Sequence, residues 1–135
     1  MRTPYLIALL LLSVSAHAQH TLQQIAEDAT RHQALSETMV ALSRCYTVGQ
    51  NQDACVAQAK SQCVGLAIGK NCGLRDEAMA DPAQSYGTAA KAQAAVSQCL
   101  TTQSKPYEEC LWDLQNACKG IGVGKFCGMV HAHSF

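Results

Sequence analysis

The sequence predicts an all-α protein in which two disulfide-stapled α-hairpin repeats pack into a small helical bundle. Three observations support this. Eight cysteines recur in one spacing pattern, apolar residues recur at helical intervals, and helix-breaking residues separate the helical stretches. The Ala-rich segments with few β-branched runs argue against a sheet, so packing of helix on helix is the expected architecture.

The cysteines form two sets with nearly the same spacing. Nine, seven and eight residues separate the members of the first set, and ten, seven and eight those of the second. The sets are Cys45, Cys55, Cys63 and Cys72, then Cys99, Cys110, Cys118 and Cys127. The surrounding residues also agree, as in CVAQAKSQCVGLAIGKNCGL at 55–74 and CLWDLQNACKGIGVGKFCGM at 110–129. A period of 54–55 residues with this match indicates a duplicated unit.

Residues 1–18 read as a signal peptide and are expected to lie outside the fold. Arg2 gives a positive start, residues 5–12 form an apolar run, and a small-x-small cleavage site ends at Ala18. Cleavage after Ala16 fits as well. The apolar run is too short for an ordinary membrane-spanning helix, and no later segment reads as one. We therefore expect a periplasmic or secreted protein.

The first repeat, residues 19–80, is expected to hold two helices. Residues 21–46 carry apolar side chains three and four apart, and Thr21 is placed to cap their start. A turn-like stretch follows, and Asp53 is the expected N-cap of a second helix over about residues 54–63.

The second repeat, residues 81–135, follows the same plan and completes one compact domain with the first. Residues 81–85 read as the joint between the repeats, and residues 86–101 as an Ala-rich helix. Pro106 interrupts the helical pattern, and residues 107–118 are expected to form the last helix.

In an exported protein, an even set of cysteines is expected to form disulfides, because the compartment is oxidising. The small, Ala-rich core also needs such covalent support. An antiparallel hairpin brings the end of its first helix next to the start of its second. This geometry favours Cys45–Cys55 and Cys99–Cys110 across the turns, with Cys63–Cys72 and Cys118–Cys127 in the Gly-rich tails. A nested pairing, first with fourth and second with third, stays open at this point.

Charge and motif content give no sign of nucleic acid, cofactor or catalysis. Ten basic and ten acidic residues cancel, and there is no basic stripe or polybasic patch. An even cysteine count leaves no spare thiol as a nucleophile, and adjacent carboxylates such as Glu108 and Glu109 point apart on a helix. We expect a protein that is not an enzyme.

Trp112 is the candidate partner-binding residue. It falls to one side of the inward stripe of its helix, so it is either wedged against the other repeat or exposed as a binding anchor. The first repeat carries Ala57 at the matching position. His32, on the apolar stripe of the first helix, is interpreted as a satisfied core or interface histidine.

These observations predict an exported, disulfide-rich protein-binding module of the bacterial envelope, for example a periplasmic immunity or inhibitor protein. Its partner would be another envelope or secreted protein. The alternative is a periplasmic metal-handling protein that uses the terminal histidines His131 and His133, since imidazole suits copper, zinc and nickel.

Overall fold

The computed structural model describes residues 20–49, 51–62, 80–124 and 126–128. Their regular structure consists of α2 (Leu22–Thr47), α3 (Gln52–Gln62), α4 (Pro82–Thr102) and α5 (Tyr107–Ala117). These residues contain no strand, so the predicted all-α class is confirmed for this part of the chain. None of the four helices is long and apolar enough to cross a membrane.

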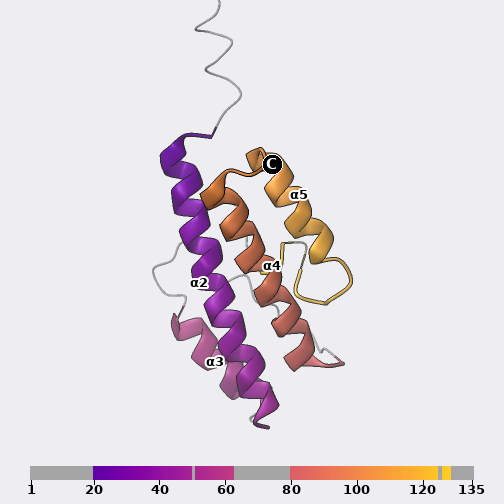
Figure 1. Cartoon of the computed structure of the whole chain (residues 1–135). Coiled ribbons are helices and arrows are strands. Elements are labelled where there is room, and N and C mark those ends of the chain that lie inside the picture. The colour runs from indigo at the N-terminus through magenta and orange to yellow at the C-terminus, as the bar shows by residue number, and fades with distance from the viewer. Residues whose placement is uncertain (1–19, 50, 63–79, 125, 129–135) are drawn as a thin grey trace, which may run out of the picture.

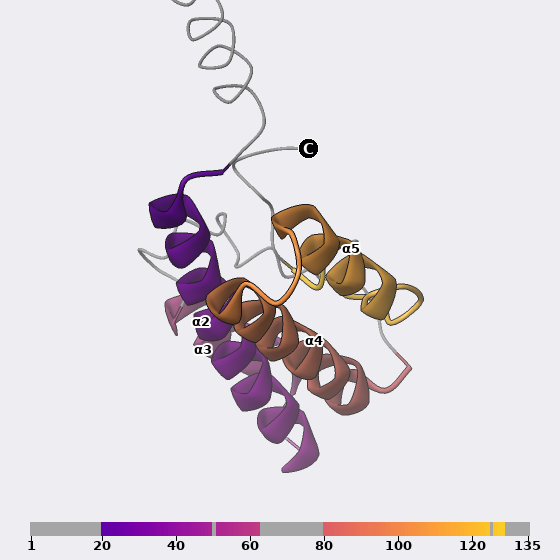
Figure 2. The ribbon, with the colours of Figure 1, turned by 45° about the horizontal axis from the view of Figure 1, so that its top comes forward.

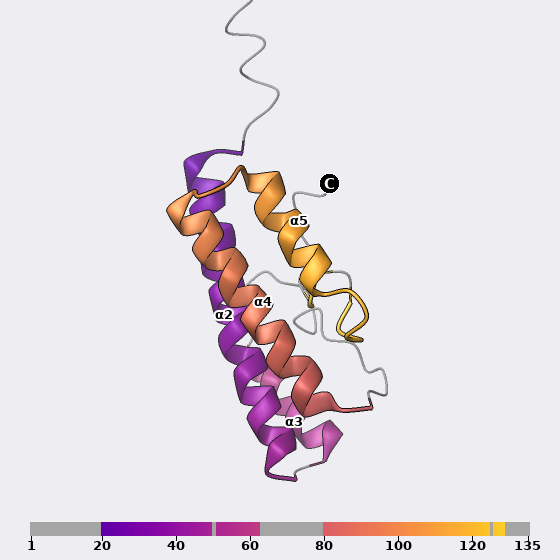
Figure 3. The same cartoon turned by 45° about the vertical axis from the view of Figure 1, so that its right-hand side comes forward.

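The long helices α2 and α4 run antiparallel and form the centre of the fold (Figure 1). Each carries one shorter helix: α3 packs on α2, and α5 packs on α4. Two further views show the same neighbours, with α5 beside α4 (Figure 2 and Figure 3).

Helix α2 begins at the residue that the sequence predicted, because a complete capping box fixes its first turn. Thr21 Oγ1 accepts a hydrogen bond from the Gln24 N–H at 3.1 Å, and the Gln24 side chain accepts one from the Thr21 N–H at 3.0 Å. The helix ends at Thr47, and Gly49 follows with φ +83°, a conformation that suits glycine.

Helix α3 begins at Gln52, two residues earlier than predicted, and Asp53 is not its cap. The side-chain oxygen of Asn51 instead accepts a hydrogen bond from the Ala54 N–H at 2.8 Å. Asn and Asp are both good N-cap residues. Asn51 is the cap here because it lies three residues before Ala54, whose N–H has no partner inside the helix.

Helix α4 begins at Pro82, so most of the segment predicted as a joint is helical. The Asp81 carboxylate caps this start by accepting from the Gln84 N–H at 3.2 Å. Pro82 lacks only an N–H that would have no partner inside the helix. An Asp-Pro pair can therefore start a helix as well as mark a turn, and here it starts one.

Close approach of α2 and α4 depends on small residues and serine hydroxyl groups. At three levels a serine donates to a backbone carbonyl of the facing helix. These bonds are Ser97 to Ala29 at 2.8 Å, Ser36 to Ala90 at 2.7 Å and Ser43 to Ala83 at 2.7 Å. Along these three contacts the residue numbers increase in α2 and decrease in α4, which defines the antiparallel register of the two helices. Around these bonds lies the apolar core, whose largest fully buried side chains include Leu35, Met39, Leu42, Tyr86, Leu111 and Leu114.

The disulfides in the described residues are those that the hairpin geometry predicted. Cys45–Cys55 joins α2 to α3 and Cys99–Cys110 joins α4 to α5, with Cα atoms 5.8 and 5.9 Å apart, while Cys118–Cys127 closes the segment after α5. The nested pairing is therefore excluded in both sets, because Cys45 and Cys99 are each bonded to the second cysteine of their set. The pair Cys63–Cys72 lies outside the described residues and stays a prediction.

The segment after α5 returns toward the core through glycines. Gly120 and Gly122 have φ values of +75° and +82°, where other residues are strained. This turn brings Cys127 back to Cys118, and Val123 is fully buried on the way. The glycines of this segment thus allow the turn that brings the two cysteines within bonding distance.

Candidate functional site

Helix α5 is covalently fixed at both ends, and Trp112 lies between the two fixed points. Cys110 in its first turn is bonded to Cys99 of α4, and Cys118 just after its last turn is bonded to Cys127. The side chain of Trp112 is 60% exposed. Of the two positions that the sequence left open, wedged or exposed, the structure shows the exposed one.

Charged side chains surround Trp112 on the outer face of α5. The Lys119 ammonium lies 6.0 Å from the centre of the indole ring, a cation–π distance. One turn toward the N-terminus, Glu108 and Glu109 are exposed on the same side of the helix. The face therefore combines one large aromatic surface with carboxylates at one end and an ammonium at the other.

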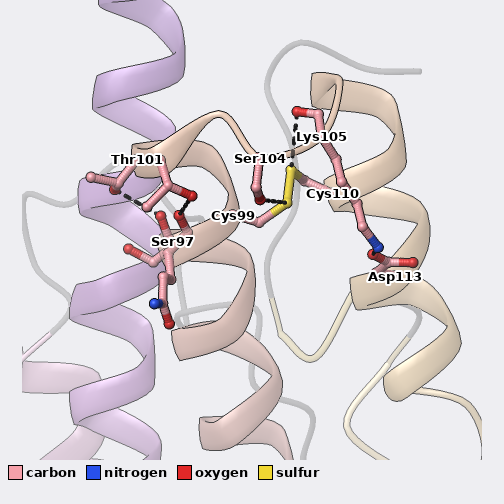
Figure 4. Close-up of a disulfide and its surroundings, with 9 residues drawn as sticks. Ser97, Cys99, Thr101, Ser104, Lys105, Cys110 and Asp113 are labelled. Carbon is pink, nitrogen blue, oxygen red and sulfur yellow. Dashed lines mark hydrogen bonds and ion pairs between the residues drawn. A yellow bond between two sulfur atoms is a disulfide. The ribbon is translucent and has the colours of Figure 1, made fainter.

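The loop that leads into α5 is held in place by polar contacts (Figure 4). The Lys105 ammonium binds the Asp113 carboxylate at 2.7 Å, and this hydrogen bond raises the pKa of Lys105. Ser104 Oγ donates to Cys99 Sγ across 3.9 Å. The Lys105 carbonyl contacts Cys110 Sγ at 3.8 Å, but a disulfide sulfur carries no hydrogen to donate. Both side chains of this ion pair are exposed, so it adds little to stability.

A buried polar cluster attaches the start of α5 to α2. Asp28 is only 1% exposed, and its carboxylate accepts from the Tyr107 hydroxyl at 2.6 Å and from Arg31 Nη1 at 2.8 Å. The ring of His20 packs on that of Tyr107, with centroids 3.8 Å apart. Two donors compensate the buried carboxylate, so the cluster can hold the two helices together. No motif in the sequence marks Asp28, although its position three residues after Ile25 places it on the inward stripe of the helix.

Stability at alkaline pH is expected to depend on Tyr107. Burial, followed by the hydrogen bond to Asp28, raises the pKa of the Tyr107 phenol above its ordinary value. A raised pKa in the folded state gives stability that is complete below about pH 10, the unfolded value, and is lost as pH rises further. Urea unfolding of the wild type should show a loss of free energy that steepens as pH rises above about 10. Tyr107→Phe, less stable at neutral pH, should lose less over the same interval, and parallel pH profiles would contradict the assignment.

His32 and Gln93 form a second buried polar connection. His32 Nδ1 and Gln93 Oε1 are 2.5 Å apart, and Gln93 Nε2 donates to the carbonyls of Phe126 and Cys127 at 2.9 and 3.1 Å. Because the amide nitrogen serves the two carbonyls, Gln93 Oε1 is the acceptor and His32 Nδ1 carries the proton. His32 is thus a hydrogen-bonded core histidine, as interpreted from the sequence, and the pair anchors the tail after α5.

The remaining candidate residues lie elsewhere in the chain. His131 and His133 are outside the described residues, as is the segment read as a signal peptide. Within the described ranges, no group of three or more His, Cys, Asp or Glu side chains is placed to hold a metal ion. No protein-family model, curated protein or solved structure matches this chain.

Proposed function

We propose that this protein is an exported protein-binding module of the bacterial envelope, such as a periplasmic immunity or inhibitor protein, and that the outer face of α5 is its contact surface. The observation that carries the proposal is the 60% exposure of Trp112 on a helix that disulfides fix at both ends. A large exposed aromatic side chain is a poor choice for a purely solvated surface and a frequent anchor in protein interfaces.

Fixing the helix has a direct consequence for affinity. Association loses free energy when loops and side chains must become ordered at the interface. The bridges at Cys110 and Cys118, together with the Tyr107–Asp28 hydrogen bond, hold α5 in one position before any partner arrives. A pre-ordered helix that displays Trp112 can therefore bind with a smaller entropic loss than a mobile segment.

The disulfides also support export. Such bridges persist in oxidising compartments such as the periplasm and are rare where thiols are kept reduced. Together with the signal-like residues 1–18, they favour a periplasmic or secreted location for the mature chain. The partner would then be another envelope or secreted protein.

We also infer that the chain consists of two copies of one hairpin, and matching hydrogen bonds support this. Thr47 donates to the Ser43 carbonyl at 2.8 Å, and Thr101 donates to the Ser97 carbonyl at 2.7 Å. Their positions differ by 54 residues, the spacing between Cys45 and Cys99. The cross-helix bonds of Ser43 and Ser97 match under the same shift. In contrast, Trp112 has only Ala57 as its counterpart, so the proposed contact belongs to the second copy alone.

Replacing Trp112 by alanine is expected to weaken partner binding about 30-fold, the effect of losing an anchor worth about 2 kcal/mol. The partner would be captured from envelope extract on the immobilised mature protein, purified, and titrated against wild type and Trp112→Ala. Val48→Ala removes an apolar side chain that is 73% exposed at the end of α2, and it should bind like the wild type. Circular dichroism should show an unchanged helical content in both variants. Equal affinity of wild type and Trp112→Ala would refute the contact surface.

Elemental analysis of the same purified protein tests the alternative of metal handling. If the protein is a protein-binding module, we expect no stoichiometric metal. Copper or zinc bound in stoichiometric amount, and lost in a His131→Ala/His133→Ala variant, would replace protein binding by metal handling as the proposed function.

A further inference from the structure

The bridge between α4 and α5 is the most accessible of the three disulfides in the described residues. Cys99 is partly exposed, whereas the other five cysteines of these bridges are buried, and the most accessible of those five, Cys45, is 9% exposed. Figure 4 shows the Cys99–Cys110 bond beside the turn that joins the two helices. A disulfide opens when a thiolate attacks one of its sulfur atoms, so access to a sulfur limits the reaction. Cys99 is therefore the sulfur at which such an attack can begin.

Two polar groups of this turn lie against the bridge and suit its reduced form. Ser104 Oγ donates to Cys99 Sγ across 3.9 Å, a contact that strengthens when the sulfur carries a negative charge. The Lys105 carbonyl lies 3.8 Å from Cys110 Sγ. The sulfur of the closed bridge has no hydrogen for this carbonyl, but the thiol of the reduced form has one. Both sulfur atoms of the open bridge thus have a polar partner already in place.

The turn closed by this bridge also contains a residue in a strained backbone conformation. Gln103, which follows α4, has φ +50°, in the left-handed region. The first copy has Gly49 at the corresponding position, 54 residues earlier, with φ +83°. Glycine adopts this conformation without a steric cost, whereas a residue with a side chain does not. Opening the bridge releases the turn and lets Gln103 leave this conformation, and strained or exposed bridges are the more easily reduced ones.

The other attachments of α5 do not depend on this bridge. The Tyr107 hydroxyl donates to the buried Asp28 carboxylate at 2.6 Å, and Leu111 lies in the core. The bridge after α5 holds the other end of the helix. With the Cys99–Cys110 bond open, α5 is therefore held less firmly but stays in the fold, and the two sulfur atoms remain close enough for the bond to form again.

We propose that Cys99–Cys110 is a redox switch that a dithiol oxidoreductase opens and the disulfide form of the same class of enzyme closes. One thiolate of the dithiol attacks Cys99 Sγ, and Cys110 leaves as a thiolate that takes up a proton. The second thiol of the reductant then attacks the mixed disulfide and releases Cys99, whose developing charge the Ser104 hydroxyl stabilises. Cys99 is protonated in turn. The bridge thus gains two electrons and two protons, and the dithiol becomes a disulfide.

The switch also regulates the contact at Trp112, and this part of the inference rests on the proposed function. Trp112 lies two residues after Cys110, so the bridge fixes the part of α5 that presents the indole ring. When the bridge is open, this part of the helix must become ordered as the partner binds, and such ordering lowers affinity. The oxidised protein is therefore the form that binds its partner tightly.

Limited reduction of the mature protein with dithiothreitol, a free dithiol, tests the switch. Thiols are trapped with N-ethylmaleimide at increasing reductant concentration and located by peptide mass mapping. We expect Cys99 and Cys110 to be modified first, while the other two described bridges stay closed and the helical circular dichroism persists. Simultaneous opening of all three bridges, earlier opening of either of the other two, or a loss of helicity with the first thiols would overturn the proposal.

Replacement of Gln103 tests why this bridge opens first. Gln103→Gly removes the strain, so the equilibrium constant for opening by dithiothreitol should fall about fivefold. Gln103→Asn should give an intermediate value, because asparagine tolerates the left-handed region better than glutamine does. The same equilibrium constant in wild type and Gln103→Gly would overturn the proposal, since the backbone of the turn would then have no effect on the bridge.

Partner binding separates the switch from the proposed function. Cys99→Ala/Cys110→Ala, which cannot close the bridge, should bind the captured partner about tenfold more weakly than wild type. Cys45→Ala/Cys55→Ala removes the bridge to α3 instead and is the matched control, expected to bind like wild type. Wild-type affinity of the first double variant, or equal weakening in both, would overturn the regulation, while weak binding by Trp112→Ala would still support the contact surface. Equal binding by all of these variants would refute the contact surface as well.

Discussion

Reduction of the disulfides is expected to abolish cooperative unfolding of this protein or to lower its melting temperature severely. Each bridge closes a short loop, with sequence separations of 10, 11 and 9 residues for the three in the described part. Loops of this length contribute about 3 kcal/mol each in the chain-entropy description. The three together approach the whole stability of a typical small domain, roughly 5–15 kcal/mol. The core has little reserve to offset that loss, since alanines make up much of the α2–α4 contact.

Thermal unfolding followed by far-ultraviolet circular dichroism, with and without a phosphine reductant, measures the effect. Thiol alkylation after reduction serves as a control against re-oxidation during the scan. A reduced protein that melts within a few degrees of the oxidised one would show that packing, not cross-linking, stabilises the fold, because such a shift corresponds to only about 1 kcal/mol. Paired Cys→Ala replacements then separate the contributions of the bridges to α3 and to α5.

Much of the helical plan could be predicted from the sequence, because its signals are local. Thr21 as the expected cap and the apolar spacing that follows it predicted α2 to within a residue at each end. Hairpin geometry favoured the pairing of Cys99 with Cys110 but left the nested pairing open, and the structure distinguishes the two. The start of α4 was missed, because an Asp-Pro pair is also a common turn signal and only the capping bond of Asp81 distinguishes the two.

Contacts between distant segments could not be predicted in the same way. The exposure of Trp112 depends on what packs against α5, and an off-stripe position is compatible with either outcome. Tyr107 is 79 residues from Asp28, and the partners of Gln93 are 33, 34 and 61 residues away, so nothing in the local pattern identifies these contacts. These polar contacts fix the relative position of the helices. They can form only when α2 and α4 pack in the register observed in the folded protein.

Replacing Gln93 should show how much these buried polar contacts contribute to the free energy of unfolding. Its side chain is fully buried and reaches three groups: His32 on α2 and the Phe126 and Cys127 carbonyls after α5. Gln93→Met keeps nearly the same volume but removes every one of these hydrogen bonds. Because the buried partners are left unsatisfied, we expect a loss of about 3 kcal/mol in the free energy of unfolding. Gln93→Ala should lose roughly 1–2 kcal/mol more, since it also leaves a cavity.

Urea unfolding gives these free energies, and Gln98→Met on the exposed side of the same helix is the matched control, expected within about 0.5 kcal/mol of the wild type. Hydrogen exchange adds a local measurement: in Gln93→Met the amides of the tail closed by Cys118–Cys127 should exchange faster, while those at the start of α2 should not. A Gln93→Met protein as stable as the Gln98→Met control would mean that the disulfide alone holds the tail. The tail would then be positioned independently of α2, and the hydrogen bonds of Gln93 would follow from the fold without stabilising it.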